Sequence, residues 1–164
     1  MKRFLKGLLL VLLVIFIIIQ FFHSPKNQST DPDPNDISIK YPVPTNVQNI
    51  LTKACYDCHS NHTRYPWYNN IQPVAWWLNN HIQNGKKMLN FSIFTSYSVG
   101  KQFKKLDDIT NEIKGGGMPL SSYTLIHRNA ILSDSEKVLL YGWVDNTKEI
   151  IRSKYPSDSL LKSR

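Results

Sequence analysis

The sequence predicts an all-α fold, and two observations lead to that prediction. Apolar side chains recur at helical spacing in four separate segments, and no segment alternates between apolar and polar residues over the length of a strand. The chain has 164 residues, of which 41% are hydrophobic. It therefore has room for one modest domain beside any targeting segment.

The chain opens with a basic and then strongly apolar segment, residues 1–23. Three basic residues come first: Lys2, Arg3 and Lys6. The apolar run that follows extends from Leu8 to Phe22, and only Gln20 interrupts it. Since no pair of small residues marks a cleavage site, we expect an uncleaved transmembrane anchor helix, with a cleaved signal peptide as the alternative. The basic end should stay in the cytoplasm, which predicts a single-pass protein of a bacterial inner membrane whose C-terminal domain faces the periplasm.

The next segment, residues 24–44, contains five prolines and has almost no apolar periodicity. Such a composition is typical of a semi-extended linker, which spans ~3.1 Å per residue. We therefore expect a tether that lets the following domain move clear of the membrane.

The domain itself is expected in residues 45–152, and a polar C-terminal tail in residues 153–164. Helical spacing predicts four helices, around residues 47–54, 74–85, 103–113 and 133–150. We expect Gly85 to end the second helix, and Ser133 with Glu136 to form a capping box at the start of the fourth. The long loops 60–72 and 115–132 are unusual in a compact domain unless something other than a protein core organises them.

The motif that carries chemistry is "CYDCH", which contains both cysteines of the chain, Cys55 and Cys58, followed by His59. Cysteines three positions apart lie on one side of a helical turn, where both thiols can add across the two vinyl groups of one haem. The adjacent histidine then supplies an imidazole nitrogen to the iron. C-x-x-C-H is therefore a signature of covalent haem attachment, and we expect one haem c with His59 as the proximal ligand.

Three other interpretations of the cysteines stay open. A zinc site would recruit Cys55, Cys58, His59 and His62, although adjacent ligands converge awkwardly on one ion. A redox dithiol normally lies at a strand-to-helix junction, which the predicted all-α fold lacks. A disulfide would close so short a loop that it would stabilise little.

The sixth position of a haem iron is filled by methionine or histidine in electron carriers, and is left open or loosely filled in sensors. Met118 lies in "KGGGMPL", where the glycines let the backbone approach a flat ring and Pro119 stiffens the loop after the sulfur. We therefore expect Met118 to be the distal iron ligand. The alternatives are His81, His62, Met88 and His127.

Charge and aromatic content give weaker expectations. Residues 45–164 carry fifteen Lys and Arg against nine Asp and Glu, a net charge of +6. Nucleic acid is an unsuitable partner for an exported domain, whereas an acidic redox partner could dock on a group of lysines or leave them as a solvated face. Those lysines are Lys86, Lys87, Lys101, Lys104 and Lys105. Arg64 is expected either to pair with a haem propionate or to be solvated. A group of aromatic residues is expected in the core and against the haem: Tyr65, Trp67, Tyr68, Trp76, Trp77 and Phe91.

Two stretches of the sequence resemble the bacterial haem-binding domain family of small, exported, single-haem domains. They read "CYDCHSNHTRYPWYNNIQPVAWWLNNHIQNGKKMLNFS" and "GGGMPLSSYTLIHRNAILSDSEKVLLYGW", within a match over about residues 47–147. The resemblance implies a cytochrome-c-like helical fold wrapped around one haem, held by Cys55, Cys58 and His59. Met118 matches the methionine of the family's Met-Pro pair, where this chain has Gly117 in place of a frequent acidic residue.

These observations predict a membrane-anchored periplasmic c-type haem protein that transfers single electrons to or from an unknown redox partner. A haem-based sensor with a displaceable sixth ligand is the rival interpretation, and an enzyme such as a peroxidase is the third. No Ser-His-Asp set, paired carboxylates or phosphate-binding loop indicates hydrolysis or phosphoryl transfer.

Overall fold

In a computed structural model, the protein is described over residues 1–161. The α-helices in this part of the chain are α1 (Lys2–Ile19), α2 (Ile37–Lys40), α3 (Thr45–Ala54), α4 (Tyr56–His59), α5 (Val74–Met88), α6 (Val99–Lys114), α7 (Ser121–Ile126), α8 (Asp134–Lys154) and α9 (Ser157–Leu161). Three 3₁₀ helices lie between them: η1 (Trp67–Asn70), η2 (Phe91–Ser96) and η3 (Arg128–Ala130). The described residues form no strand, apart from one isolated antiparallel bridge between Gln28 and His62. The all-α prediction is confirmed.

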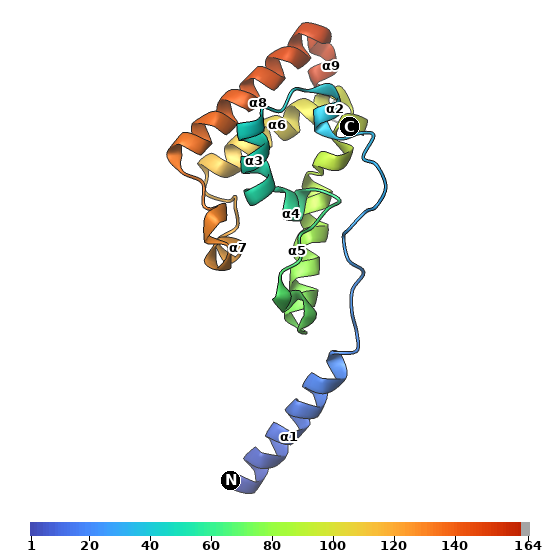
Figure 1. Ribbon diagram of the computed structural model, residues 1–164, viewed down its shortest axis with the longest axis vertical. Coiled ribbons are helices and arrows are strands. Elements are labelled where there is room, and N and C mark those ends of the chain that lie inside the picture. Colours follow the sequence, from blue (N-terminus) through green and yellow to red (C-terminus); the bar gives the residue numbers. More distant parts are fainter. Residues whose placement is uncertain (162–164) are drawn as a thin grey trace.

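The hydrophobic core lies between α3, α6 and α8, which Figure 1 shows at the upper end of the domain. Its fully buried side chains include Leu51 from α3, Leu106 from α6, and Leu140 and Ile151 from α8. These residues face the core because apolar positions recur at helical spacing. Helix α5 extends from this core toward the opposite end of the domain.

The start of α8 carries the predicted capping box. The Ser133 hydroxyl accepts a hydrogen bond from the Glu136 backbone N–H at 3.3 Å, and the Glu136 carboxylate accepts one from the Ser133 backbone N–H at 2.9 Å. Helix α6 ends at Lys114, just before the three consecutive glycines, also as predicted.

The expected end of α5 at Gly85 is wrong, because the helix continues to Met88. The Leu89 backbone N–H still bonds to the Gly85 carbonyl oxygen at 2.9 Å, and the chain becomes extended only at Leu89. Gly85 thus lies inside the helix, where glycine costs stability unless a close contact requires it.

The segment 24–44 differs from the expected free linker, because it packs along the domain. Ile37 and Tyr41 are fully buried in the core, and the Tyr41 hydroxyl donates a hydrogen bond to Gln102 at 2.5 Å. The buried Asn27 side chain donates to the Ser60 carbonyl oxygen at 2.8 Å. The prolines interrupt the apolar pattern of the segment. The pieces between them are too short for a helical pattern to predict that they contain core residues.

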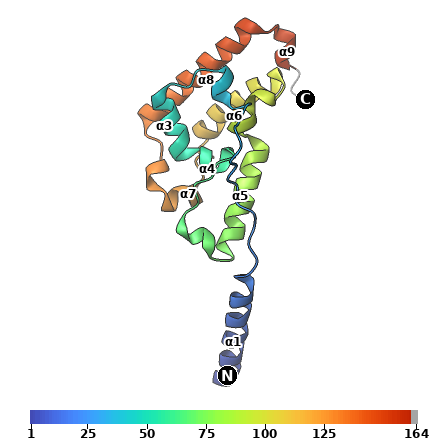
Figure 2. The same cartoon turned by 45° about the vertical axis from the view of Figure 1, so that its right-hand side comes forward.

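Helix α1 projects away from the domain, from the end where α5 begins, in both views (Figures 1 and 2). Two hydrogen bonds of Gln72 fix the junction between α1 and the domain. Its backbone N–H donates to the Gln20 side-chain oxygen at 2.9 Å, and its side chain donates to the Phe22 carbonyl oxygen at 2.7 Å. The sequence predicted a transmembrane anchor here. Within residues 1–161, however, no helix combines the length and apolarity needed to cross a membrane, and α1 has 18 residues with three basic side chains among them.

The expected polar tail, residues 153–164, is partly folded. Helix α8 continues to Lys154, α9 follows beside α6, and Tyr155 and Leu160 pack against the core. Residues 162–164 of this tail lie outside the described part of the chain.

Candidate haem site

Both cysteines and His59 lie on one short helical turn that directly follows α3. The Cys55 carbonyl oxygen accepts hydrogen bonds from the backbone N–H of Cys58 at 3.1 Å and from that of His59 at 2.9 Å. These bonds define α4 and bring two free thiols and an imidazole onto the same turn. This arrangement is the one that C-x-x-C-H chemistry requires.

The imidazole of His59 is oriented by the end of α5. Its Nδ1 lies 3.0 Å from the Leu89 carbonyl oxygen, and since a carbonyl can only accept, Nδ1 carries the proton. The other nitrogen, Nε2, is then the unprotonated one and can bind a metal. Burial lowers the pKa of His59, against the opposing effect of the Leu89 and Gly85 carbonyl oxygens, so the neutral, metal-binding form is favoured.

Two adjoining cavities lie beside this turn, with volumes of about 400 and 170 Å³. Six residues line both of them: Ala54, Cys55, His59, Met88, Met118 and Pro119. The larger cavity also has apolar walls from η2, α6 and the chain before α8, at Phe91, Ile109, Ile113 and Leu132. A mostly apolar cavity of this size, with a few polar groups on its wall, is typical of cofactor sites, which span roughly 300–1,000 Å³.

The lining fits a haem group. Its flat apolar face would lie against the apolar walls, the thiols of Cys55 and Cys58 would meet its edge, and His59 Nε2 would reach the iron. Lys104 and Lys105 also line the larger cavity, and a lysine ammonium group can pair with a haem carboxylate. Helical spacing alone does not show which face of α6 meets the motif, so the place of these two lysines beside the cavity cannot be seen in the sequence.

Gly85 allows α5 to pack directly on the haem-binding turn. A Cβ atom at this position would lie 2.7 Å from the Cys58 carbonyl oxygen and 3.2 Å from the Cys58 Cβ. Any side chain would push α5 away from α4, and with it the Leu89 carbonyl oxygen that orients His59. The sequence does contain this glycine, but a glycine near the end of an apolar pattern equally predicts the end of a helix.

Among the candidates for the distal ligand, the structure places three beside the same cavities as His59. Met118 and Met88 line both cavities, and His81 lines the smaller one. The Nδ1 atom of His81 is 2.9 Å from the Trp77 carbonyl oxygen and donates to it, so Nε2 is the ring nitrogen outside this bond.

The other two candidate histidines, His62 and His127, lie elsewhere and form hydrogen bonds with other side chains. The Nε2 atom of His62 is 2.6 Å from the Asp33 carboxylate. His127 stacks on Tyr123 with ring centroids 4.4 Å apart, and its Nε2 is 2.8 Å from the Tyr68 hydroxyl. Neither histidine lines the cavities beside His59.

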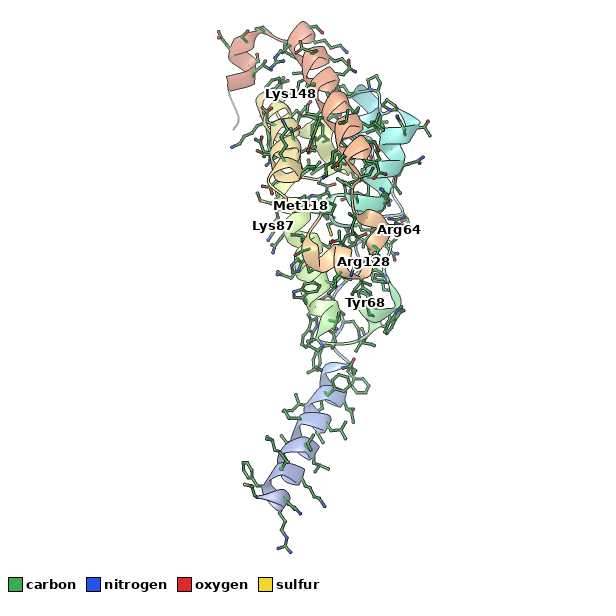
Figure 3. All side chains as sticks on the ribbon, turned by 90° about the vertical axis from the view of Figure 1, so that its left-hand side faces the viewer. Arg64, Tyr68, Lys87, Met118, Arg128 and Lys148 are labelled. Atoms are coloured by element: carbon green, nitrogen blue, oxygen red, sulfur yellow. The ribbon has the colours of Figure 1, made fainter. Side chains whose placement is uncertain are left out.

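The Met118 loop is held to the end of α6. The Glu112 carbonyl oxygen accepts hydrogen bonds from the backbone N–H groups of Gly117 at 2.9 Å and Met118 at 3.2 Å. Gly116 has a φ of +74°, a conformation that favours glycine and lets the chain turn back after α6. Figure 3 shows the result, with Met118 at mid-height of the domain.

The Arg64 side chain is 60% exposed to solvent, as one of the two expectations had it, and it is also paired with Asp57 of the same chain. Its Nε donates to the Asp57 carboxylate at 3.0 Å, and a terminal nitrogen donates to the Thr52 carbonyl oxygen at 2.5 Å. Asp57 itself, the buried acid inside the motif, was not singled out from the sequence.

Most of the aromatic group lies outside the two cavities. Phe91 lines the larger cavity, as expected, but Trp67, Trp76 and Trp77 are exposed near the end of the domain that carries α1. The Trp76 indole donates to the Phe22 carbonyl oxygen at 3.0 Å. Trp76 therefore belongs to the junction with α1 and not to the cavities.

The structure also bears on the other interpretations of the cysteines. His62 is turned toward Asp33, and no group of three or more His, Cys, Asp or Glu side chains within residues 1–161 is placed to hold a metal ion. Burial raises the pKa of Cys55 to about 12 and that of Cys58 to about 11. Catalytic dithiols work through a lowered thiol pKa, so this site lacks their characteristic activation.

Comparison with known proteins gives one family. A haem-binding domain family matches residues 14–146, which include α2 to α7, the "CYDCH" turn, Met118 and the segment 24–44. No curated protein matches the chain, and no solved structure does. Since the match spans most of the sequence and contains the whole site just described, the chain belongs to the haem-binding domain family.

Proposed function

We propose that the protein is an exported c-type haem protein that carries single electrons. The thiols of Cys55 and Cys58 would form thioether bonds to one haem, and His59 Nε2 and the Met118 sulfur would be the ligands of its iron. When bound, the haem iron supplies a one-electron oxidation–reduction couple. The observation that carries this proposal is the convergence of both thiols, an oriented imidazole and a methionine on two adjoining cavities.

The protein's own contribution is to hold the two axial ligands in place. The Leu89 carbonyl oxygen fixes the His59 ring, and the Glu112 carbonyl oxygen fixes the backbone of Met118. Ligands held by the fold in this way change little between oxidation states, which suits electron transfer better than catalysis at the iron. We therefore propose a carrier and not an enzyme.

Covalent attachment is the first part of the proposal to test. The full-length protein should be produced together with a c-type maturation system and then extracted with acidified acetone. The haem should stay with the polypeptide, and Cys55→Ala with Cys58→Ala in one chain should release it into the solvent. A freely extractable haem in the wild type, or bound zinc in its place, would overturn the proposal.

The proposed location is the periplasmic face of a bacterial inner membrane. Covalent haem attachment to C-x-x-C-H takes place outside the cytoplasm, and α1 exposes apolar side chains around its whole circumference, which favours burial in lipid. Full-length protein should stay with washed membranes until detergent is added. Mature protein in the soluble periplasmic fraction, beginning beyond residue 20, would show a cleaved signal peptide instead.

The proposed partner is an acidic redox protein. Lys87 and Lys104 are exposed and lie on α5 and α6, the two helices that border the cavities. Other lysines of the predicted group have internal contacts: Lys86 with Asn27, Lys101 over the Tyr97 ring, and Lys105 with Asp108. Charge complementarity mainly accelerates encounter, so electron exchange with an acidic acceptor should slow as salt rises.

A haem-based sensor is the second candidate, because more than one side chain can compete for the sixth position. His81 and Met88 line the same cavities as Met118, so displacement of one ligand by another or by a small gas has a structural basis. Rapid carbon monoxide binding by the reduced wild type would favour the sensor, and slow or absent binding would favour the carrier.

A further inference from the structure

The Asp57 carboxylate links the haem-binding turn to a distant part of the chain. The residue is buried, with 8% of its surface exposed, and it lies between the two cysteines of the motif. Its Oδ1 accepts hydrogen bonds from the Arg64 backbone N–H at 3.1 Å and from Arg64 Nε at 3.0 Å. Its Oδ2 accepts hydrogen bonds from the Tyr123 hydroxyl at 2.8 Å and from Arg64 Nη2 at 3.3 Å. Asp57 is therefore an acceptor shared by Arg64 and by a residue 66 positions further along the chain.

Tyr123 is the contact that reaches beyond the turn. It lies on α7, which begins three residues after Met118, and it lines the smaller cavity with Met118, Pro119 and Leu120. Burial and the neighbouring Asp57 carboxylate raise the pKa of Tyr123, so the phenol keeps its proton and donates it to the hydrogen bond.

The Met118 loop is therefore tied down on both sides. Before the methionine, the Glu112 carbonyl oxygen holds the loop to α6. After it, the Tyr123–Asp57 hydrogen bond holds α7 to the haem-binding turn. The first tie fixes the loop to a helix of the core, whereas the second fixes it to the turn that carries His59.

We propose that the Asp57–Tyr123 hydrogen bond is a latch that positions Met118 opposite His59 and keeps the sixth position closed. Asp57 and Tyr123 are positioning residues that act through the loop and do not touch the iron. The proposal rests on the proposed role of Met118 as distal ligand. It adds that the motif's own acidic residue controls how firmly that ligand is held.

The chemistry of the pair explains why this single bond can matter. A hydrogen bond to an ionised carboxylate is roughly twice as strong as one between neutral groups. Asp57 is buried and Tyr123 is half-buried, so solvent competes less with this bond than with one at the surface. Loss of the Tyr123 hydroxyl would leave Asp57 its bonds to Arg64, and the turn itself should keep its structure.

The test uses the haem-containing full-length protein and two variants in which a tyrosine loses its hydroxyl group. Tyr123→Phe removes the latch, and Tyr65→Phe is the matched control, because the Tyr65 hydroxyl accepts a hydrogen bond from the Asn27 backbone N–H at 2.7 Å and has no contact with Asp57. Tyr123→Phe should weaken the near-infrared sulfur-to-iron charge-transfer band of the oxidised protein. It should also accelerate carbon monoxide binding to the reduced protein by about tenfold or more, the factor that corresponds to a lost hydrogen bond to a charged group. Tyr65→Phe should leave both unchanged.

A second variant changes Asp57, the acceptor of the same hydrogen bond. Asp57→Asn should weaken the same bond, because a neutral amide is a poorer acceptor than a carboxylate, and its effect on the band should be smaller in the Tyr123→Phe background than in the wild type, because the two side chains share that bond. Amide hydrogen exchange in α7 should accelerate in both variants, a readout that does not depend on the haem. Identical bands and binding rates in Tyr123→Phe, Tyr65→Phe and wild type would overturn the latch alone. A wild type without the band would overturn both the Met118 ligand and the latch.

Discussion

The Cβ position of Gly85 lies 2.7 Å from the carbonyl oxygen of Cys58, a distance at which a side chain does not fit. Helix α5 can approach the haem-binding turn so closely because residue 85 has no side chain. Four residues further on, the same helix delivers the Leu89 carbonyl oxygen to Nδ1 of His59. The position of one glycine thus couples the packing of α5 to the orientation of the proximal imidazole.

Substitution of Gly85 should therefore damage the site and the fold together. Gly85→Ala should lower the free energy of unfolding by about 1–3 kcal/mol, the usual range for overpacking, because the new methyl group meets backbone that cannot move aside. It should also lower the yield of protein with attached haem. Urea unfolding and the haem-to-protein absorbance ratio measure the two effects.

Gly142 provides the matched control for this substitution. It lies inside α8, and a Cβ there would meet nothing within 4 Å. Gly142→Ala should therefore stabilise the protein by roughly 0.5–1 kcal/mol through helix propensity and leave haem attachment unchanged. Equal behaviour of the two alanine variants would show that α5 does not need the close approach.

The packing of the segment 24–44 can be tested with two isoleucines that lie two residues apart. Ile37 is fully buried in the core, whereas Ile39 has 68% of its surface exposed. Ile37→Ala should lower the free energy of unfolding by about 2–5 kcal/mol, and Ile39→Ala by less than about 0.5 kcal/mol. Equal, small effects would mean that the segment is the free tether that its prolines suggested.

The elements that could be predicted from the sequence are those whose signals are local. The apolar spacing predicts α3 and α6, and the capping box predicts the start of α8. Each of these signals consists of residues that are close together in the sequence, so it can be recognised without knowing the rest of the fold. The haem-binding turn is local for the same reason. Its three functional side chains occupy five consecutive residues.

The remaining features depend on contacts between distant residues. Ile37 and Tyr41 belong to the core only because η2 and α6 lie beside them, and a proline-rich segment gives no sign of such neighbours. Gly85 looked like a helix end because a close approach to Cys58 cannot be seen in the sequence. The roles of Asp57 and Tyr123 are hidden for the same reason, since 66 residues separate them along the chain.

The capping box of α8 should make stability depend on pH in a defined direction. The Lys53 ammonium group, 2.6 Å from the Glu136 carboxylate, and the Ser133 backbone N–H lower the pKa of Glu136 below its ordinary value of 4.5. A carboxyl group with a lowered pKa in the folded state stabilises the protein above that ordinary value, and the contribution disappears as the pH falls through the folded pKa.

Two variants separate the charge of this box from its capping geometry. Glu136→Gln should lower the free energy of unfolding by up to about 1 kcal/mol at pH 7, because the Lys53 pair is partly solvated, and by much less at pH 3. Ser133→Ala removes the cap itself and should cost about 1 kcal/mol at pH 7. Urea unfolding at the two pH values measures both. A Glu136→Gln penalty that persists at pH 3 would show that the charge is not its source.

The identity of the distal ligand decides between the carrier and the sensor, and the two methionines that line both cavities can be separated by substitution. Met118 is held by the Glu112 carbonyl oxygen and through α7, whereas Met88 is the last residue of α5 and has 64% of its surface exposed. A firmly held thioether opposite His59 keeps the iron six-coordinate and favours its reduced form. Met118→Ala should therefore abolish the sulfur-to-iron charge-transfer band, lower the reduction potential and open the iron to carbon monoxide. Met88→Ala should retain the band. Loss of the band in Met88→Ala and not in Met118→Ala would move the ligand to α5, and a wild type without any such band would leave His81 as the side chain placed to bind the iron.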